Sequence, residues 1–83
     1  MSLDDRSTRI DRNSPRMLSD QVANDLRADI EQRKVTGRLP TELELAAQYG
    51  VGRITIRRAV ATLVSEGLLQ VIHGRGTFIT PRS

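Results

Sequence analysis

The sequence predicts a mainly α-helical domain of three helices closed by a two-stranded β-hairpin. Apolar residues recur at helical spacing between residues 18 and 30, and two shorter helical patterns flank the turn Gly50-Val51-Gly52. Two runs of branched apolar residues, 68–72 and 77–80, follow around a glycine-containing turn. Two helices joined by a three-residue turn form a helix-turn-helix. The added hairpin makes the predicted fold a winged helix-turn-helix.

Length and composition exclude several classes of protein. The chain of 83 residues allows one domain with a thin core. It has no cysteine, which excludes disulfides and thiolate metal sites and indicates a reducing cytoplasm. No apolar run is long enough for a membrane span or a secretion signal. We therefore expect a cytoplasmic protein without a membrane partner, and a single histidine, His73, argues against a metal site.

The positive charge of the chain lies in its C-terminal half. The net charge is +3. Residues 17–50 carry four cations and six anions, whereas residues 52–83 carry five cations and one anion, Glu66. This asymmetry suits a polyanionic partner around the second half. A similar excess is also common on proteins that bind nothing charged, so charge alone leaves both interpretations open.

Residues 1–16 are expected to form a mobile polar arm. They alternate Asp, Arg, Ser, Thr and Asn, and only Leu3 and Ile10 are sizeable apolar residues. Such a composition cannot build a core. The four arginines of the arm are offset by three aspartates, which favours a solvated tail over an arm that lies in a DNA groove.

The first helix follows Pro15. Its apolar positions recur at spacings of three and four, with charged residues on the opposite side. They are Leu18, Val22, Ala23, Leu26 and Ile30. This pattern predicts about four turns that end between Lys34 and Gly37. Because Leu39 precedes a proline, which disfavours helix at that position, we expect it to cover the core from a short strand.

Thr41-Glu42-Leu43-Glu44 predicts the start of the second helix. A threonine and a glutamate three residues later can satisfy each other's free backbone donors as a capping box. Leu45, Ala46 and Tyr49 form the buried stripe of this helix, and Gly50 provides a left-handed stop.

The third helix begins at its N-cap, Gly52, ends at Glu66-Gly67, and has two different faces. The apolar stripe comprises Ile56, Ala59, Val60 and Leu63, and the residues outside it near the N-terminal end are Arg53, Ile54, Arg57 and Arg58. A helix that buries one side and presents arginines from its first turns has the form of a recognition helix, which enters the DNA major groove by its N-terminal residues. Arginines in a first turn oppose the helix dipole, so helix propensity does not explain them.

His73-Gly74-Arg75-Gly76 is the predicted turn of the hairpin, because its glycines permit positive φ. Glycine-basic-glycine is also simply a turn, but its place at the tip of a wing favours a role for Arg75 at the minor groove, with His73 beside it. The turn is not a nucleotide-binding loop, since it lies between strands and no helix N-terminus follows.

An ordered set of motifs between residues 18 and 80 carries a family resemblance. These motifs are Leu39-Pro40-Thr41-Glu42, Leu45-Ala46, Tyr49-Gly50-Val51, Arg53, Thr55, Arg57-Arg58-Ala59, Leu63, Glu66-Gly67-Leu68 and Gly74-Arg75-Gly76-Thr77-Phe78. Together they resemble the DNA-binding domain of the GntR family of bacterial transcription regulators. Members of this family usually carry a C-terminal domain that binds a ligand and dimerises. The resemblance implies a homodimeric operator-binding regulator, in most cases a repressor, with no cofactor in this part. Its small-molecule effector would bind a domain that follows residues 81–83.

The resemblance assigns contacts with base edges or phosphates to Arg53 and Arg57. It assigns phosphate contacts to Thr55 and to the backbone around Gly52. Arg58 points further round the helix and is expected to contact a phosphate or to be plain surface. The full set of predicted DNA-binding residues is Thr41, Leu43, Gly52, Arg53, Ile54, Thr55, Arg57, Arg58, His73, Gly74 and Arg75. The alternative for the arginines is a solvated helix face.

Leu43 and Ile54 depart from the family pattern, which usually has an arginine and a small hydroxyl residue at these two positions. Both lie off the apolar stripes of their helices. Single exposed aliphatic side chains are ordinary and often carry no function. The alternative is that these side chains touch thymine methyl groups in the major groove.

The sequence does not predict an enzyme. Glu42, Glu44 and Glu66 lie at helix ends, where capping explains the first two. No nucleophile, base and orienting group come together in the pattern. The remaining alternative to DNA binding is a winged helix that serves as a protein-interaction module, with its third helix docked on an acidic partner.

Overall fold

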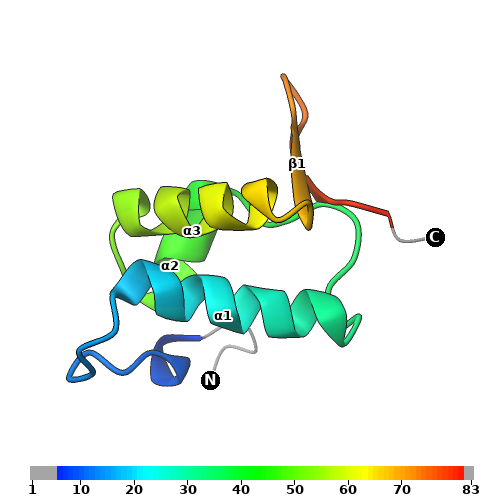
Figure 1. Cartoon of the computed structure of the whole chain (residues 1–83). Helices are drawn as coiled ribbons and strands as arrows, with labels where there is room; N and C mark the ends of the chain where they lie inside the picture. The colour runs from blue at the N-terminus through cyan, green and yellow to red at the C-terminus, as the bar shows by residue number, and fades with distance from the viewer. Residues whose placement is uncertain (1–5, 82–83) are drawn as a thin grey trace.

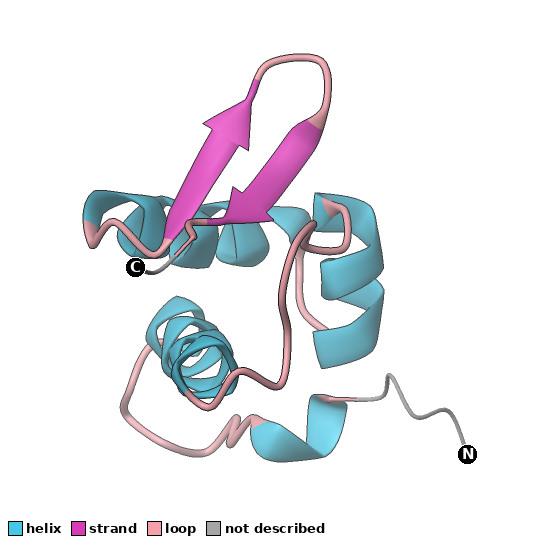
Figure 2. Cartoon of the chain, turned by 90° about the vertical axis from the view of Figure 1, so that its right-hand side faces the viewer, coloured by secondary structure: helices cyan, strands magenta, loops and turns pink. Residues whose placement is uncertain are grey.

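The computed structural model describes residues 6–81, which form three α-helices followed by a two-stranded antiparallel sheet (Figure 1). The elements are the 3-10 turn η1 (Ser7–Arg9), α1 (Leu18–Glu31), α2 (Glu42–Tyr49), α3 (Arg53–Ser65), β1 (Leu69–Ile72) and β2 (Gly76–Ile79). Both α1 and α2 pack against α3. The hairpin projects from the C-terminal end of α3, away from the helices (Figure 2). This arrangement confirms the predicted winged helix-turn-helix.

The core lies where the three helices meet. Its largest fully buried side chains are Tyr49, Leu26, Leu45, Ile56, Leu63 and Val22. The apolar stripes predicted for α1, α2 and α3 all contribute to it, although Val60 and Leu18 are only partly buried at its margin. The apolar spacing therefore placed the buried face of each helix correctly.

The ends of α2 form as predicted. The Thr41 hydroxyl accepts from the Glu44 amide at 3.1 Å, and the Glu44 side chain accepts from the Thr41 amide at 2.9 Å. Gly50 ends the helix with φ of 67°, a left-handed conformation that glycine adopts without steric cost. Gly52 then serves as the N-cap of α3. Local backbone chemistry thus fixes the helix-turn-helix.

The end of α1 differs from the prediction. The helix stops at Glu31, before the predicted break at 34–37. Arg33 takes the left-handed conformation with φ of 58°, and the Lys34 amide donates to the Asp29 carbonyl at 2.9 Å. An arginine therefore stands where glycine is usual, so no residue at this position signals the end of the helix.

The wing is wider at its base than a simple hairpin. Leu69 pairs with Ile79 and Ile72 with Gly76 across the two strands. On the other edge of β2, the Leu39 amide donates to the Thr77 carbonyl and the Ile79 amide donates to the Gly37 carbonyl, each at 2.8 Å. This short third segment buries Leu39, as expected from the sequence.

The structure corrects the expectation of a mobile, solvated arm for residues 6–16. This segment packs along α1 and the end of α2, and Ile10 is buried in the core. The Gln21 side chain bonds both the amide and the carbonyl of Asp11, at 2.7 and 2.9 Å. One apolar side chain suffices because hydrogen bonds and ion pairs tie the polar residues to the helices. Residues 1–5 and 82–83 lie outside the described part of the chain.

Candidate nucleic-acid interface

Glu42 joins two arginines of α3 to the start of α2. Its Oε1 accepts from Arg53 Nε at 3.1 Å and from Arg57 Nη2 at 2.9 Å, and its Oε2 accepts from Arg57 Nε at 3.1 Å. The two arginine side chains remain 61% and 64% exposed. The carboxylate therefore holds two guanidinium groups on one face of α3 while leaving most of their surface open.

The electrostatics of this cluster match its geometry. The hydrogen bond from Arg57, followed by the one from Arg53, lowers the pKa of Glu42 below its ordinary value. The same bond raises the pKa of the Arg57 guanidinium. One carboxylate between two guanidinium groups leaves the cluster with one net positive charge.

The bridging role of Glu42 was missed in the sequence. The sequence pattern predicts capping by both Glu42 and Glu44, but the structure gives the capping box to Glu44 alone. A capping box needs only the glutamate three residues after the threonine. The other glutamate was therefore a candidate partner for the arginines at the start of the next helix.

The remaining predicted residues of α2 and α3 surround this cluster. Leu43 is 64% exposed and Ile54 is 62% exposed, which makes them among the most exposed large apolar residues of the described chain. Thr55 is partly buried, and Gly52 is exposed at the N-cap. The Thr41 hydroxyl is already used by the capping box. Exposed apolar side chains thus lie beside the cluster on both helices, with Ile54 next to Arg53 in the first turn of α3 and Leu43 next to Glu42 in the acidic first turn of α2.

A groove with a volume of about 360 Å³ separates the arginine cluster from the base of the wing. Arg57 and Val60 line it from α3, Val71 lines it from β1, and Arg38 lines it from the segment before α2. Arg38 is exposed and was not predicted as part of the site. Because Arg38 and Arg57 line the same groove, Arg38 adds a cation on the side of the domain where Arg57 lies.

The wing tip carries His73, Gly74 and Arg75, all exposed. Gly74 has φ of 78°, and the Arg75 amide donates to the Ile72 carbonyl at 2.9 Å to close the turn. The tip stands well away from the helices (Figures 1 and 2). The structure therefore brings Arg53 and Arg57 together but keeps the predicted wing residues as a separate group. Within residues 6–81, neither Arg58 nor Arg75 forms an ion pair.

Other kinds of site find little support in residues 6–81. No group of three or more His, Cys, Asp or Glu residues in this range is arranged to hold a metal ion. None of its helices has the length and apolar character that crossing a membrane requires.

A family model matches most of this fold. The model described as bacterial regulatory proteins, gntR family, matches residues 18–79. The chain belongs to the GntR family. This confirms the resemblance read from the sequence motifs, and because the family consists of regulatory proteins, it also confirms that the chain is not an enzyme.

Related proteins support the same assignment. The HTH-type transcriptional repressor NagR of Bacillus subtilis is 38% identical over 73 residues, which are 86% of this chain and 30% of NagR. The DNA-binding domain of AraR in complex with operator ORX1 is 40% identical, with a TM-score of 0.74 over 86% of this chain and 94% of that chain. YtrA of Sulfolobus acidocaldarius, a GntR-family transcription factor, is 28% identical, with a TM-score of 0.79 over 89% of this chain and 80% of that chain. This chain spans between a quarter and a third of the length of the curated relatives.

Proposed function

We propose that this chain is the operator-binding domain of a bacterial transcription regulator. The observation that carries the proposal is the pair Arg53 and Arg57, held side by side and exposed at the start of α3 by Glu42. A recognition helix reads base edges with its N-terminal residues, and arginine is the side chain that most often contacts guanine. Similarity to a DNA-binding domain crystallised with its operator supports the same conclusion.

The proposed contacts follow from the position of each residue. Arg53 and Arg57 contact base edges or phosphates, and Arg58 contacts the phosphate backbone further round the helix. Thr55 and the backbone at Gly52 contact phosphates at the helix start, where free amide groups favour anions. The wing tip, with His73, Gly74 and Arg75, lies at an adjacent minor groove.

Leu43 and Ile54 are proposed to contact thymine methyl groups. Both are exposed beside the arginine cluster, and neither is needed by the core. We expect Ile54→Thr to lower affinity most for sites with thymine at the contacted step, and Leu43→Arg to shift preference toward guanine. Selection of DNA from a random pool, with wild type and both variants in parallel, measures this. Motifs that stay unchanged at every position would assign both residues to ordinary surface.

Selection of bound duplexes from a random pool tests the function itself. A selected motif is expected, with a binding constant that falls steeply with salt, by a log-log slope of about −0.9 for each neutralised phosphate. Absence of duplex binding at low salt would contradict the proposal. It would favour the alternative of a protein-interaction module.

The whole protein is proposed to be a cytoplasmic homodimeric repressor, with a small-molecule effector bound by a further domain. The greater length of the curated relatives supports this proposal, and NagR is named as a repressor. A dimer of helix-turn-helix domains reads two half-sites related by a two-fold axis and spaced by about one or more helical turns. A selected motif without such symmetry, obtained with the full-length protein, would contradict the dimer.

A further inference from the structure

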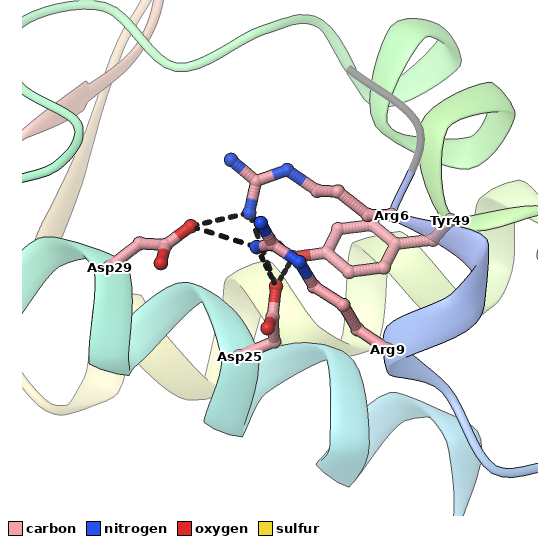
Figure 3. Close-up of polar contacts among 5 residues, drawn as sticks. All are labelled: Arg6, Arg9, Asp25, Asp29 and Tyr49. Carbon is pink, nitrogen blue, oxygen red and sulfur yellow. Dashed lines mark hydrogen bonds and ion pairs between the residues drawn. The ribbon is translucent and has the colours of Figure 1, made fainter. Parts of the chain in front are cut away.

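An acidic site lies on the side of the domain formed by α1 and the end of α2. Asp25 and Asp29 lie one turn apart on α1, and the Tyr49 hydroxyl donates to Asp25 Oδ2 at 2.5 Å (Figure 3). Asp29 is only 7% exposed. Two carboxylates so close together and so far from solvent need a cationic partner.

Arg6 supplies that partner. Its Nη1 lies 2.6 Å from Asp29 Oδ2, 3.1 Å from Asp25 Oδ2 and 3.3 Å from the Tyr49 hydroxyl (Figure 3). Its guanidinium carbon is 5.6 Å from the centroid of the Tyr49 ring, within the range of a cation–π contact. Arg9 adds contacts of 3.3 Å to both carboxylates. One arginine thus contacts α1 and α2 at the same time.

The same segment also covers the C-terminal end of α2. The Arg6 amide donates to the Gln48 carbonyl at 2.7 Å, and the Arg12 guanidinium donates to the carbonyls of Tyr49 and Gly50. The last carbonyls of a helix lack intrahelical partners and carry its partial negative charge. Cations placed there satisfy both needs.

These contacts bridge two helices that otherwise pack chiefly on a third. Both α1 and α2 pack on α3, and η1 packs on α2. The match to the family model begins at residue 18. The bridge is therefore built by a segment that precedes the matched part of the chain.

We propose that residues 6–12 clamp α2 against α1, and that Arg6 is a positioning residue for DNA binding. This inference rests on the proposed operator-binding function. The clamp holds the Tyr49 end of α2, whereas Glu42, at the opposite end, holds Arg53 and Arg57. A helix of eight residues moves as a short rigid rod, about 12 Å long. Displacement of one end is therefore passed to the arginines at the other.

The test compares four variants of the full chain: Arg6→Ala, Arg6→Lys, Arg12→Ala and, as a matched control, Arg16→Ala. Arg16 lies in the same segment and is exposed, so its replacement removes the same charge without touching the clamp. Duplex affinity is measured over a series of salt concentrations. Exposure of Tyr49 is measured by acrylamide quenching, because Tyr49 is the only tyrosine and the chain has no tryptophan.

Arg6→Ala is expected to weaken duplex binding on the order of three- to tenfold more than the control does. The log-log salt slope should stay that of wild type, since the Arg6 guanidinium binds Asp25, Asp29 and Tyr49 in the proposed clamp rather than a phosphate. Quenching of Tyr49 should increase. Arg6→Lys should restore part of the duplex affinity and part of the protection of Tyr49 from quenching, because lysine keeps the charge but not the planar guanidinium. If Arg6→Ala does not fold, Arg12→Ala carries the same test, because it loosens the α2 end without leaving carboxylates unpaired.

Three results would overturn the clamp. Equal loss of affinity in Arg6→Ala and Arg16→Ala would reduce the effect to long-range charge. A salt slope reduced by about 0.9 in Arg6→Ala would show a direct phosphate contact instead. Failure of wild type to bind any duplex would contradict the proposed function, whereas unchanged Tyr49 quenching in Arg6→Ala would contradict the clamp itself.

Discussion

Arg57→Ala is expected to damage recognition of a specific operator far more than general attraction to DNA. In the structure Arg57 supplies two of the three hydrogen bonds that Glu42 receives, and its side chain is 64% exposed. Loss of a bidentate base contact lowers affinity for the specific site about 5- to 150-fold. The variant also leaves Glu42 with Arg53 as its one remaining partner. We therefore expect a loss in the upper half of that range.

The assay measures affinity for the selected operator and for a random duplex of equal length at one salt concentration. Arg58→Ala is the matched control, since it removes the same charge from the same helix and should weaken both duplexes about equally. Adding Glu42→Gln to Arg57→Ala should recover part of the loss, because it removes the carboxylate left facing the DNA. A loss of equal size on specific and random duplexes for Arg57→Ala would refute the base-reading role.

Three further predictions concern the wing, the end of α1 and the core. Arg75→Ala should reduce affinity most for operators with A·T-rich flanks, whose narrow minor groove concentrates negative potential; equal loss on G·C-rich flanks in a binding titration would leave Arg75 as simple charge. Arg33→Gly should raise the free energy of unfolding by about 0.5–1 kcal/mol, measured with denaturant, because it relieves a left-handed arginine against the added chain entropy of glycine. Burial, followed by the hydrogen bond to Asp25, raises the pKa of Tyr49 above its ordinary value. The neutral phenol is therefore favoured in the folded state, and the free energy of unfolding should fall as pH rises above about 10. A flat pH profile in that window, or the same fall in Tyr49→Phe, would contradict this assignment.

Most of the fold could be predicted because its determinants are local. The capping box at Thr41, the left-handed Gly50 and the apolar stripe of α3 each lie within a few residues of sequence. Helical periodicity and capping motifs identify such features directly from the sequence. The end of α1 could not be predicted because Arg33 takes the left-handed conformation, which arginine rarely adopts.

The long-range ion pairs could not be predicted in the same way. Arg6 and Asp29 are 23 residues apart, and Arg27 and Glu66 are 39 apart. The periodicity of a sequence does not indicate which residue a charged side chain pairs with, so the composition of residues 1–16 predicts a solvated arm. The bridge from Glu42 to Arg57 spans 15 residues and was missed for the same reason. Composition predicts how much charge each part of the chain has, but not which of these charges are neutralised by ion pairs.

The pairing of these charges explains how a chain of modest net charge can present a cationic face. Two basic residues of the N-terminal segment, Arg6 and Arg9, pair with Asp25 and Asp29 of the acidic α1. Arg27 binds Glu66, the only acid after residue 52. Among residues 6–81, the ion pairs of the α3 arginines are those that Arg53 and Arg57 form with Glu42, which sets the direction of both side chains. Neutralisation on one side of the domain therefore concentrates the positive field around α3 and the wing.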